Sequence, residues 1–169
     1  YPYDPDKAVA LLKEAGVAMP LSLTLTLPPT PYARGGGPVI AQALARVGIQ
    51  VRLEHVEWTQ WLAGAFQGHF DMTIINHVEP LDYQIYADPR YYFGYDSAAF
   101  RTLVARHAAS GNARERRMLF LQMQRHLAED AVNAWIFAPQ ISTVVRKGLK
   151  GVWMNYPIFA HDVAAMHWG

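Results

Sequence analysis

The sequence contains no cysteine. A chain without cysteine has no disulfide, no thiolate metal site and no cysteine nucleophile, and it fits a reducing or an oxidising compartment equally well. Long apolar runs are missing too, since none reaches the roughly 18 residues that a membrane span needs. The formal net charge is only +1, and Arg114, Arg116 and Arg117 form the one basic cluster. We therefore expect no nucleic-acid partner.

Sequence motifs of enzymes are also missing. No Gly-x-Ser-x-Gly elbow surrounds any serine, and Gly35-Gly36-Gly37-Pro38 lacks the Gly-Lys-Ser/Thr ending of a phosphate-binding loop. We interpret these glycines as a flexible loop before a helix, with an anion site at the helix start as the alternative. The sequence predicts no cofactor.

The composition is that of a packed domain. Of the 169 residues, 51% are hydrophobic and 17% are charged, which is enough apolar material for a core. The first residues, YPYDPDKA, show neither an initiator Met nor a signal-peptide pattern. We expect the chain to be a piece of a longer protein whose N-terminal portion carries any targeting signal.

The first half of the chain predicts strand–helix–strand units. Asp4 and Pro5 begin a helix over 5–15, and the alternating LSLTLTL predicts a strand over 21–27. A loop over 28–37 should precede a helix that contains Val39, Ile40, Ala43, Leu44 and Val47 and stops at Gly48. A strand from Ile49, a helix over 59–67 and a strand over 70–76 follow. Short connections between such elements predict a mostly parallel sheet.

The second half predicts a long aromatic connection followed by helices. Helices are expected over 97–109 and 113–130, with Met118, Leu119, Leu121, Met123 and Leu127 as core candidates. The segment 133–145 is apolar and strand-like, and the tail 147–169 has no clear periodicity. The connection 78–96 is long for a compact domain, and such loops are usually functional.

Polar residues follow the third predicted strand. His77 ends this strand beside Glu79 and Asp82, and ligands gather at the carboxyl ends of parallel strands. The three side chains could hold a divalent ion or act as an acid and a base, although a hydrogen-bonded or ligand-contacting histidine is commoner. We predict no metal site and no catalytic residue.

Aromatic residues suggest one wall of a cleft. Tyrosine has a rigid apolar ring with a polar tip, which suits a cleft around a small ligand, and Tyr83 and Tyr86 lie nearest the third strand. The alternative is that the tyrosines of this connection close an open edge of the fold. Trp58 and Trp61 are expected in the core or at the cleft rim.

The order of these segments resembles a known family. YPYDPDKAVALLKEAG, GPVIAQALARVGIQVRLEHVEW, GHFDMTIINH and DAVNAWIFAPQISTVVRKGLKGV together span nearly the whole chain. They resemble the C-terminal portion of the peptide/nickel-type solute-binding proteins, which include dipeptide- and oligopeptide-binding proteins.

The resemblance implies an α/β fold, namely the C-terminal lobe of a type II periplasmic-binding-protein fold with βαβ units and a mostly parallel sheet flanked by helices. Residues 1–146 would form this lobe, and 147–169 would return to an N-terminal lobe after a crossing near 141–146. Two lobes closing on a small-molecule or peptide ligand would deliver it to the permease of an ABC importer, without catalysis. The location implied is periplasmic, or extracytoplasmic with a lipid anchor. The alternatives are the sensing domain of a transcriptional regulator and a metal-assisted hydrolase.

The resemblance also bears on which residues bind the ligand and on what the ligand is. The peptide-binding proteins that this chain resembles have Gly-Trp after the third strand, followed by a turn whose aspartate binds the amino group of the peptide. This chain has a different spacing over 76–82. The ligand therefore stays open between peptides, nickel complexes, glutathione, opines and oligosaccharides. The predicted wall consists of Tyr32, Asn76, His77, Glu79, Asp82, Tyr83 and Tyr86. The apolar tail is expected to pack on the missing lobe or on a second copy of the chain, giving a dimer.

Overall fold

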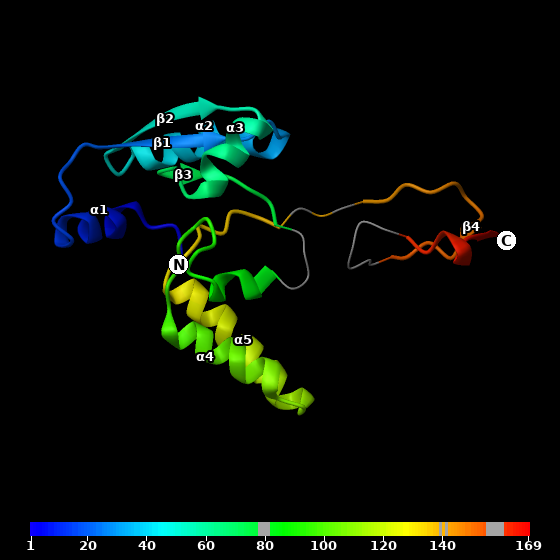
Figure 1. Ribbon diagram of the computed structural model, residues 1–169. Coiled ribbons are helices and arrows are strands. Elements are labelled where there is room, and N and C mark those ends of the chain that lie inside the picture. The colour runs from blue at the N-terminus through cyan, green and yellow to red at the C-terminus, as the bar shows by residue number, and fades with distance from the viewer. Residues whose placement is uncertain (78–81, 139, 141, 155–160) are drawn as a thin grey trace. The chain divides into compact units, whose positions relative to one another are not determined.

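The computed structural model describes residues 1–77, 82–138, 140, 142–154 and 161–169 (Figure 1). The chain divides into two compact units, which we describe one at a time. The sheet unit contains Tyr1–Asn76 and Arg90–Gly94, and the helical unit contains His77–Pro89 and Tyr95–Gly169. Among the described residues, no helix combines the length and the apolar character that a membrane span requires.

The sheet unit begins with the predicted helix. Helix α1 covers Pro5–Glu14, and the Asp4 side chain caps it by accepting the Lys7 N–H at 2.9 Å. Pro5 occupies the first helical position, where its missing N–H costs nothing. Gly16 follows the helix at a φ of 68°, a left-handed conformation that glycine adopts without strain.

A parallel sheet of three strands forms the centre of this unit. Strand β1 (Leu21–Leu27) lies between β2 (Ile49–His55) and β3 (Met72–Thr73), and both pairings are parallel. Strands β1 and β2 confirm the prediction, whereas β3 is shorter than the expected 70–76. The Asp71 carboxylate accepts the Thr24 N–H at 2.8 Å, so a side chain takes over the hydrogen bonding where β3 begins.

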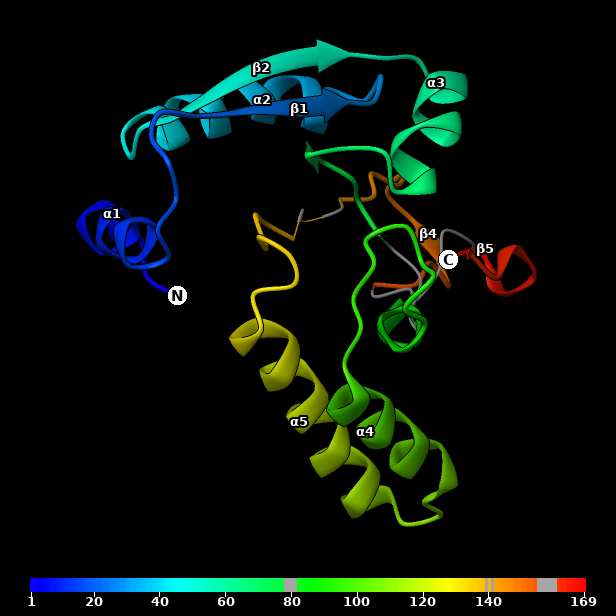
Figure 2. The same ribbon diagram turned by 60° about the vertical axis from the view of Figure 1, so that its left-hand side comes forward.

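Helix α2 covers Pro31–Ala45 and lies along one face of β1 and β2 (Figure 2). The predicted loop over 28–37 is therefore wrong. Thr30 starts the helix by accepting the Ala33 N–H at 3.4 Å, and Pro31 stands at the first helical position, so local signals outweigh the glycines that follow. The helix ends at Ala45, so Val47 lies just outside it, while Gly48 adopts the expected left-handed conformation with a φ of 85°.

One of the three glycines in α2 has a packing reason. A Cβ at Gly37 would lie 2.6 Å from Leu27 Cδ1, so only glycine lets the helix sit this closely on β1. Gly35 has open space around the same position, and at Gly36 the nearest atom is Ile74 Cδ1 at 3.8 Å. Each glycine costs a helix interior about 1 kcal/mol relative to alanine.

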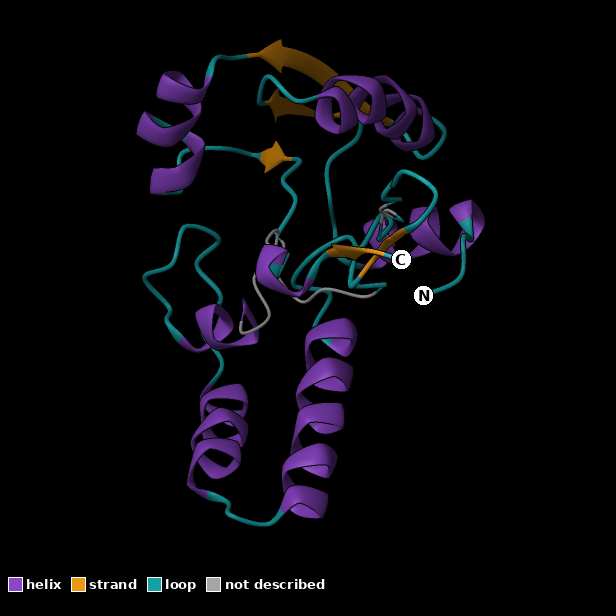
Figure 3. Ribbon diagram, turned by 90° about the vertical axis from the view of Figure 1, so that its right-hand side faces the viewer, coloured by secondary structure: helices purple, strands orange, loops and turns teal. Residues whose placement is uncertain are grey.

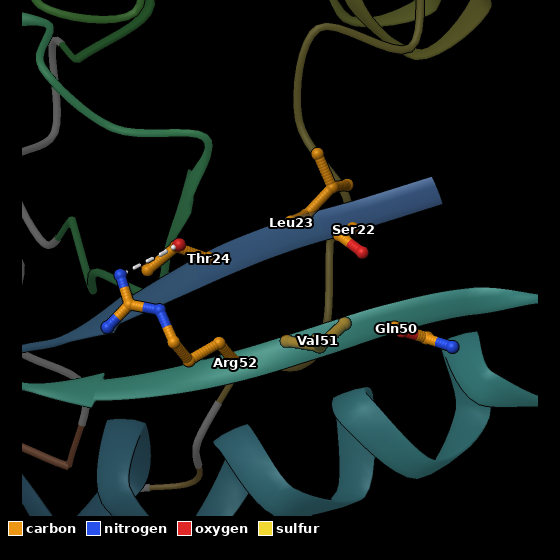
Figure 4. Close-up of a pocket in the computed structure, with 6 residues that line it drawn as sticks. All are labelled: Ser22, Leu23, Thr24, Gln50, Val51 and Arg52. Carbon is orange, nitrogen blue, oxygen red and sulfur yellow. Dashed lines mark hydrogen bonds between the residues drawn. The ribbon is translucent and has the colours of Figure 1, made fainter. Parts of the chain in front are cut away.

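The two faces of the sheet differ in polarity. On the α2 side lies a core made of Leu25, Leu27, Ala33 and Ile74. Residues with the opposite parity, Ser22, Thr24, Gln50 and Arg52, alternate with these along the strands. Together with Leu23 and Val51 they line an open hollow of about 440 Å³ (Figure 4). Within it Arg52 donates a hydrogen bond to Thr24 Oγ1 at 3.1 Å. These residues lie in the first halves of β1 and β2, away from the carboxyl ends of the strands.

A short helical segment and an aromatic cluster complete the sheet unit. The predicted helix 59–67 is present as α3 (Trp58–Ala63) and the 3-10 turn η1 (Ala65–Gln67), which Gly64 separates. The Trp61 ring is buried, and its Nε1–H donates to Thr73 Oγ1 at 3.0 Å. Phe66 and Tyr92 pack beside Trp61, with ring centroids 5.6 and 5.9 Å away. Residues 90–94 are thereby joined to the sheet unit.

The helical unit is built on an antiparallel pair of helices, α4 (Ala98–Ala109) and α5 (Ala113–Glu129), which Figure 3 shows as two long purple coils. Both helices confirm the prediction. Leu119, Met123 and Leu127 are buried, as expected, whereas Met118 and Leu121 are about half exposed and lie outside the core. The 3-10 helix η2 (Asp82–Ala87) packs against α4.

Polar side chains join the start of α4 to the end of α5. Ser97 caps α4, and its Oγ lies 3.1 Å from His126 Nε2. Asp130 Oδ2 lies 3.4 Å from the same nitrogen and accepts the Tyr95 hydroxyl proton at 2.6 Å. Burial, and after it the hydrogen bond to Asp130, raises the pKa of the Tyr95 phenol above its ordinary value. Because both partners share Nε2, this cluster lacks the geometry of a catalytic triad.

The C-terminal segment corrects one prediction. The described residues between 133 and 145 contain no strand, although their apolar character suggested one. Further on, β4 (Leu149–Lys150) pairs antiparallel with β5 (His167–Trp168), and a 3-10 turn η3 covers Val163–Ala165. The tail thus pairs its own two ends. The expected crossing near 141–146 and the boundary at 146 remain predictions, and Ile141 lies outside the described residues.

Candidate functional site

The order of the strands points to one edge of the sheet. The chain passes from β1 to β2 on one side and then returns across β1 to β3 on the other side. The direction of the connections therefore reverses between β1 and β3. In open parallel sheets, ligands bind at the carboxyl ends of the strands where such a reversal occurs.

Two of the predicted wall residues meet at this reversal. Tyr32 lies in the first turn of α2, just after β1, and Asn76 follows β3. The Asn76 backbone N–H donates to the Tyr32 hydroxyl at 3.2 Å. A tyrosine hydroxyl can also donate its own proton, so the half-buried Tyr32 can offer a hydrogen bond to a ligand oxygen. Tyr32 lies in a helix and not in the loop that the sequence suggested.

An ion pair lies at the carboxyl end of the neighbouring strand β2, and the sequence analysis missed it. Arg34 donates to Glu57 Oε1 at 3.1 Å, and both side chains are largely exposed. Arg34 follows Tyr32 by two residues, or about 200° around the helix, so the two side chains leave α2 on opposite sides. The sequence analysis placed the start of α2 too late, so it left Arg34 in a loop. The sequence signal that could have pointed to the pair was Glu57, immediately before Trp58 at the start of α3.

The other predicted wall residues belong to the helical unit. His77 Nδ1 lies 2.9 Å from Asp82 Oδ2, and about a quarter to a third of each side chain is exposed. Glu79, the third member of the predicted cluster, lies outside the described residues. The described residues contain no group of three side chains that could hold a metal ion. Either side chain is able to form a hydrogen bond with a ligand. The ligand-binding role of this pair stays a prediction.

The two candidate tyrosines differ in their surroundings. Tyr83 packs edge-on against His107 and Phe120, with centroids 5.6 and 5.5 Å away. Tyr86 is buried beside Phe100, and the Asn133 side-chain amide donates a hydrogen bond to its hydroxyl. This placement favours a packing role for Tyr86, the alternative that the sequence left open.

The two tryptophans divide in a similar way. The buried Trp61 belongs to the core, whereas 41% of Trp58 is exposed. Trp58 lies next to Glu57 in the sequence, at the exit of β2.

Comparison with known proteins identifies the family. The profile of the bacterial extracellular solute-binding proteins, family 5 (middle region), matches residues 1–97, which is more than half of the chain. The chain belongs to this family. The predicted resemblance to peptide/nickel-type binding proteins is confirmed.

Curated relatives of this solute-binding family match the chain at moderate identity. Di/tripeptide-binding protein 2 of Pseudomonas aeruginosa (strain UCBPP-PA14) is 38% identical over 83 residues, which are 46% of this chain and 15% of that protein. The dipeptide-binding protein of Escherichia coli (strain K12) is 40% identical over 73 residues, or 40% of this chain and 14% of that protein. Each match thus covers a small part of a much longer relative.

Solved structures confirm the fold. The periplasmic binding protein DppA of Helicobacter pylori, in complex with the peptide STSA, is 27% identical and superposes with a TM-score of 0.66 over 78% of this chain and 28% of that chain. The putative peptide-binding protein AppA of Clostridium difficile gives a TM-score of 0.78 over 100% of this chain and 38% of that chain, at 20% identity. The α/β fold of a type II periplasmic-binding-protein lobe is therefore confirmed.

Proposed function

We propose that the chain is the C-terminal lobe of the solute-binding component of an ABC importer, and that its ligand is a short peptide. The observation that carries this proposal is the Tyr32–Asn76 contact at the reversal between β1 and β3, in a chain of the solute-binding family. Several relatives are named for binding di- and tripeptides, which favours peptides over the other ligands considered.

The mechanism is reversible capture. A ligand that contacts both lobes favours their closed arrangement, and the permease of the importer recognises that arrangement. The chain would supply one wall, and an N-terminal lobe of the same protein would supply the other. No bond is broken, so we infer no catalytic role. The protein would work in the periplasm, or outside the cytoplasm on a lipid anchor.

The other two candidate functions receive no support. The relatives named above are binding proteins, and none is described as a regulator or a hydrolase. A metal-assisted hydrolase would also need a third ligand beside His77 and Asp82, and the described residues supply none.

Charged groups at the carboxyl end of β2, on the same edge of the sheet, suit a zwitterionic ligand such as a peptide. Arg34 can attract a carboxylate and Glu57 can attract an ammonium group, and their exposed ion pair costs only about 0–1 kcal/mol to open.

Calorimetric titration of the full-length protein with dialanine tests the proposal. We expect binding by the unmodified protein and about 5- to 150-fold weaker binding after Tyr32→Ala, the range for losing a buried polar contact of 1–3 kcal/mol. Ser22→Ala, on the polar sheet face away from the edge, is the matched control and should bind normally. Failure of di- and tripeptides to bind would reject the peptide ligand. Unchanged affinity in Tyr32→Ala and in the joint alanine variant of His77, Glu79 and Asp82 would reject the site.

Two further proposals concern the isolated chain. It should bind dialanine at least 100-fold more weakly than the full-length protein, because half the contacts and the closure are missing. We also propose that the tail 147–169 packs on the N-terminal lobe, or on a second copy in its absence. The exposed side chains of Met154 and Trp168 support a partner for this segment.

A further inference from the structure

The first half of α2 is an unusual helix. Gly35, Gly36 and Gly37 occupy successive positions, and Pro38 follows inside the helix. Gly37 is required because Leu27 packs against it, but Gly35 and Gly36 have room for a side chain. Packing therefore explains one glycine of the three. The other two give the backbone freedom that alanine would remove.

Pro38 weakens the same place. Proline has no N–H, so it cannot donate to the carbonyl of Arg34, four residues earlier, and its ring crowds that carbonyl. A helix is tolerant of proline in its first turn, so the residues from Pro38 onward form a sound helix of their own. The backbone hydrogen bonding of α2 is therefore weakest around Gly35 and Gly36, the two glycines that have room for a side chain.

The preceding turn is held by Ala33, which is fully buried in the core of the sheet unit, and by three polar contacts at the edge of the sheet, so opening must also expose Ala33. Thr30 accepts the Ala33 N–H at 3.4 Å, the Tyr32 hydroxyl accepts the Asn76 N–H at 3.2 Å, and Arg34 pairs with Glu57 at 3.1 Å. The ion pair is exposed and the other two contacts are single neutral hydrogen bonds, so each is weak. Gly37, seated on the fully buried Leu27, is the fixed point beyond them.

We propose that residues 31–36 form a hinged first segment of α2, which opens about Gly35 and Gly36 while Gly37 stays anchored on β1. Opening carries Tyr32 and Arg34 away from Asn76 and Glu57 and gives the edge of the sheet two states. The role of this movement, which is to adapt the ligand-binding wall to its ligand, rests on the proposed function. The hinge itself does not, and it is tested without a ligand.

Amide hydrogen exchange in the unliganded full-length protein tests the hinge. In the helix, the N–H groups of residues 35–37 bond to the carbonyls of residues 31–33, and opening exposes them. We expect these amides to be at least tenfold less protected than those of residues 41–45 in the same helix and of residues 117–119, which hold the equivalent positions in α5.

The paired substitution Gly35→Ala/Gly36→Ala should raise the protection of positions 35–37 about 15- to 30-fold, from the helix propensities of two alanines. Gly111→Ala, at another glycine with open space but outside any helix, is the control and should leave these amides unchanged. The hinge is rejected if residues 35–37 are as protected as residues 41–45, or if the paired substitution leaves their exchange unaltered. Neither result bears on dialanine binding, which the titration above measures.

Discussion

The neighbouring glycines of α2 should respond to alanine with opposite signs. At Gly37 the new methyl group would lie 2.6 Å from Leu27 Cδ1 and 3.0 Å from Cδ2, and Leu27 is fully buried. Overpacking of this kind costs about 1–3 kcal/mol, of which the better helix propensity of alanine returns about 1 kcal/mol. We expect Gly37→Ala to lower the free energy of unfolding by about 1 kcal/mol.

At Gly36 the nearest atom would be Ile74 Cδ1 at 3.8 Å, an ordinary contact. Gly36→Ala should therefore raise the free energy of unfolding by about 1 kcal/mol. The two variants should differ by about 2 kcal/mol, a large difference for a domain whose total stability is on the order of 5–15 kcal/mol.

Urea denaturation followed by circular dichroism measures both variants in the full-length protein. A double-mutant cycle isolates the cause: in a Leu27→Ala background the cavity accepts the methyl group, and Gly37→Ala should become neutral or stabilising. If Gly37→Ala stabilises the unmodified protein as much as Gly36→Ala does, α2 does not sit on Leu27 as described.

Three other predictions follow from side-chain contacts and from the tail. Trp61→Phe removes the Nε1–H that Thr73 accepts and should cost about 1 kcal/mol or more in urea denaturation, whereas Trp58→Phe, at an exposed ring, should cost much less. Because the pKa of Tyr95 is raised, the folded protein keeps a proton that the unfolded chain loses, so stability falls as the pH rises above about 10. Tyr95→Phe should reduce this alkaline loss, and an identical pH profile would contradict the reasoning. Deletion of 147–169 should leave the helical content and the denaturation midpoint of the remaining chain unchanged, because the tail strands pair with each other; unfolding of the truncated chain would show that the tail belongs to its core.

Local signals in the sequence predicted most of the elements. The bounds of β1 were predicted correctly because Leu alternates with Ser or Thr over the strand, and the start of α1 was predicted correctly because Asp4 caps it. Such signals act between residues a few positions apart, so they are legible without the fold. The family resemblance was also legible, because it rests on the order of these segments.

The candidate site was predicted only in part. The polar residues Asn76, His77 and Asp82 do follow β3, but the strand ends at Thr73, three residues earlier than its apolar pattern predicted. The Arg34–Glu57 pair was not found, since it joins residues 23 positions apart through the packing of α2 against the sheet. Tyr83 and Tyr86 look alike in sequence, and only their neighbours make Tyr86 a buried packing residue.

The sequence by itself thus determined the elements that depend on capping, alternation and turn residues, together with the family. Tertiary structure decided where a helix could run through three glycines, because that depends on how closely Gly37 approaches Leu27. It also decided the short β3, where Asp71 replaces part of the ladder, and the lack of a strand in the described part of 133–145. A strand needs a partner for its backbone groups, and an apolar pattern cannot say whether one is present.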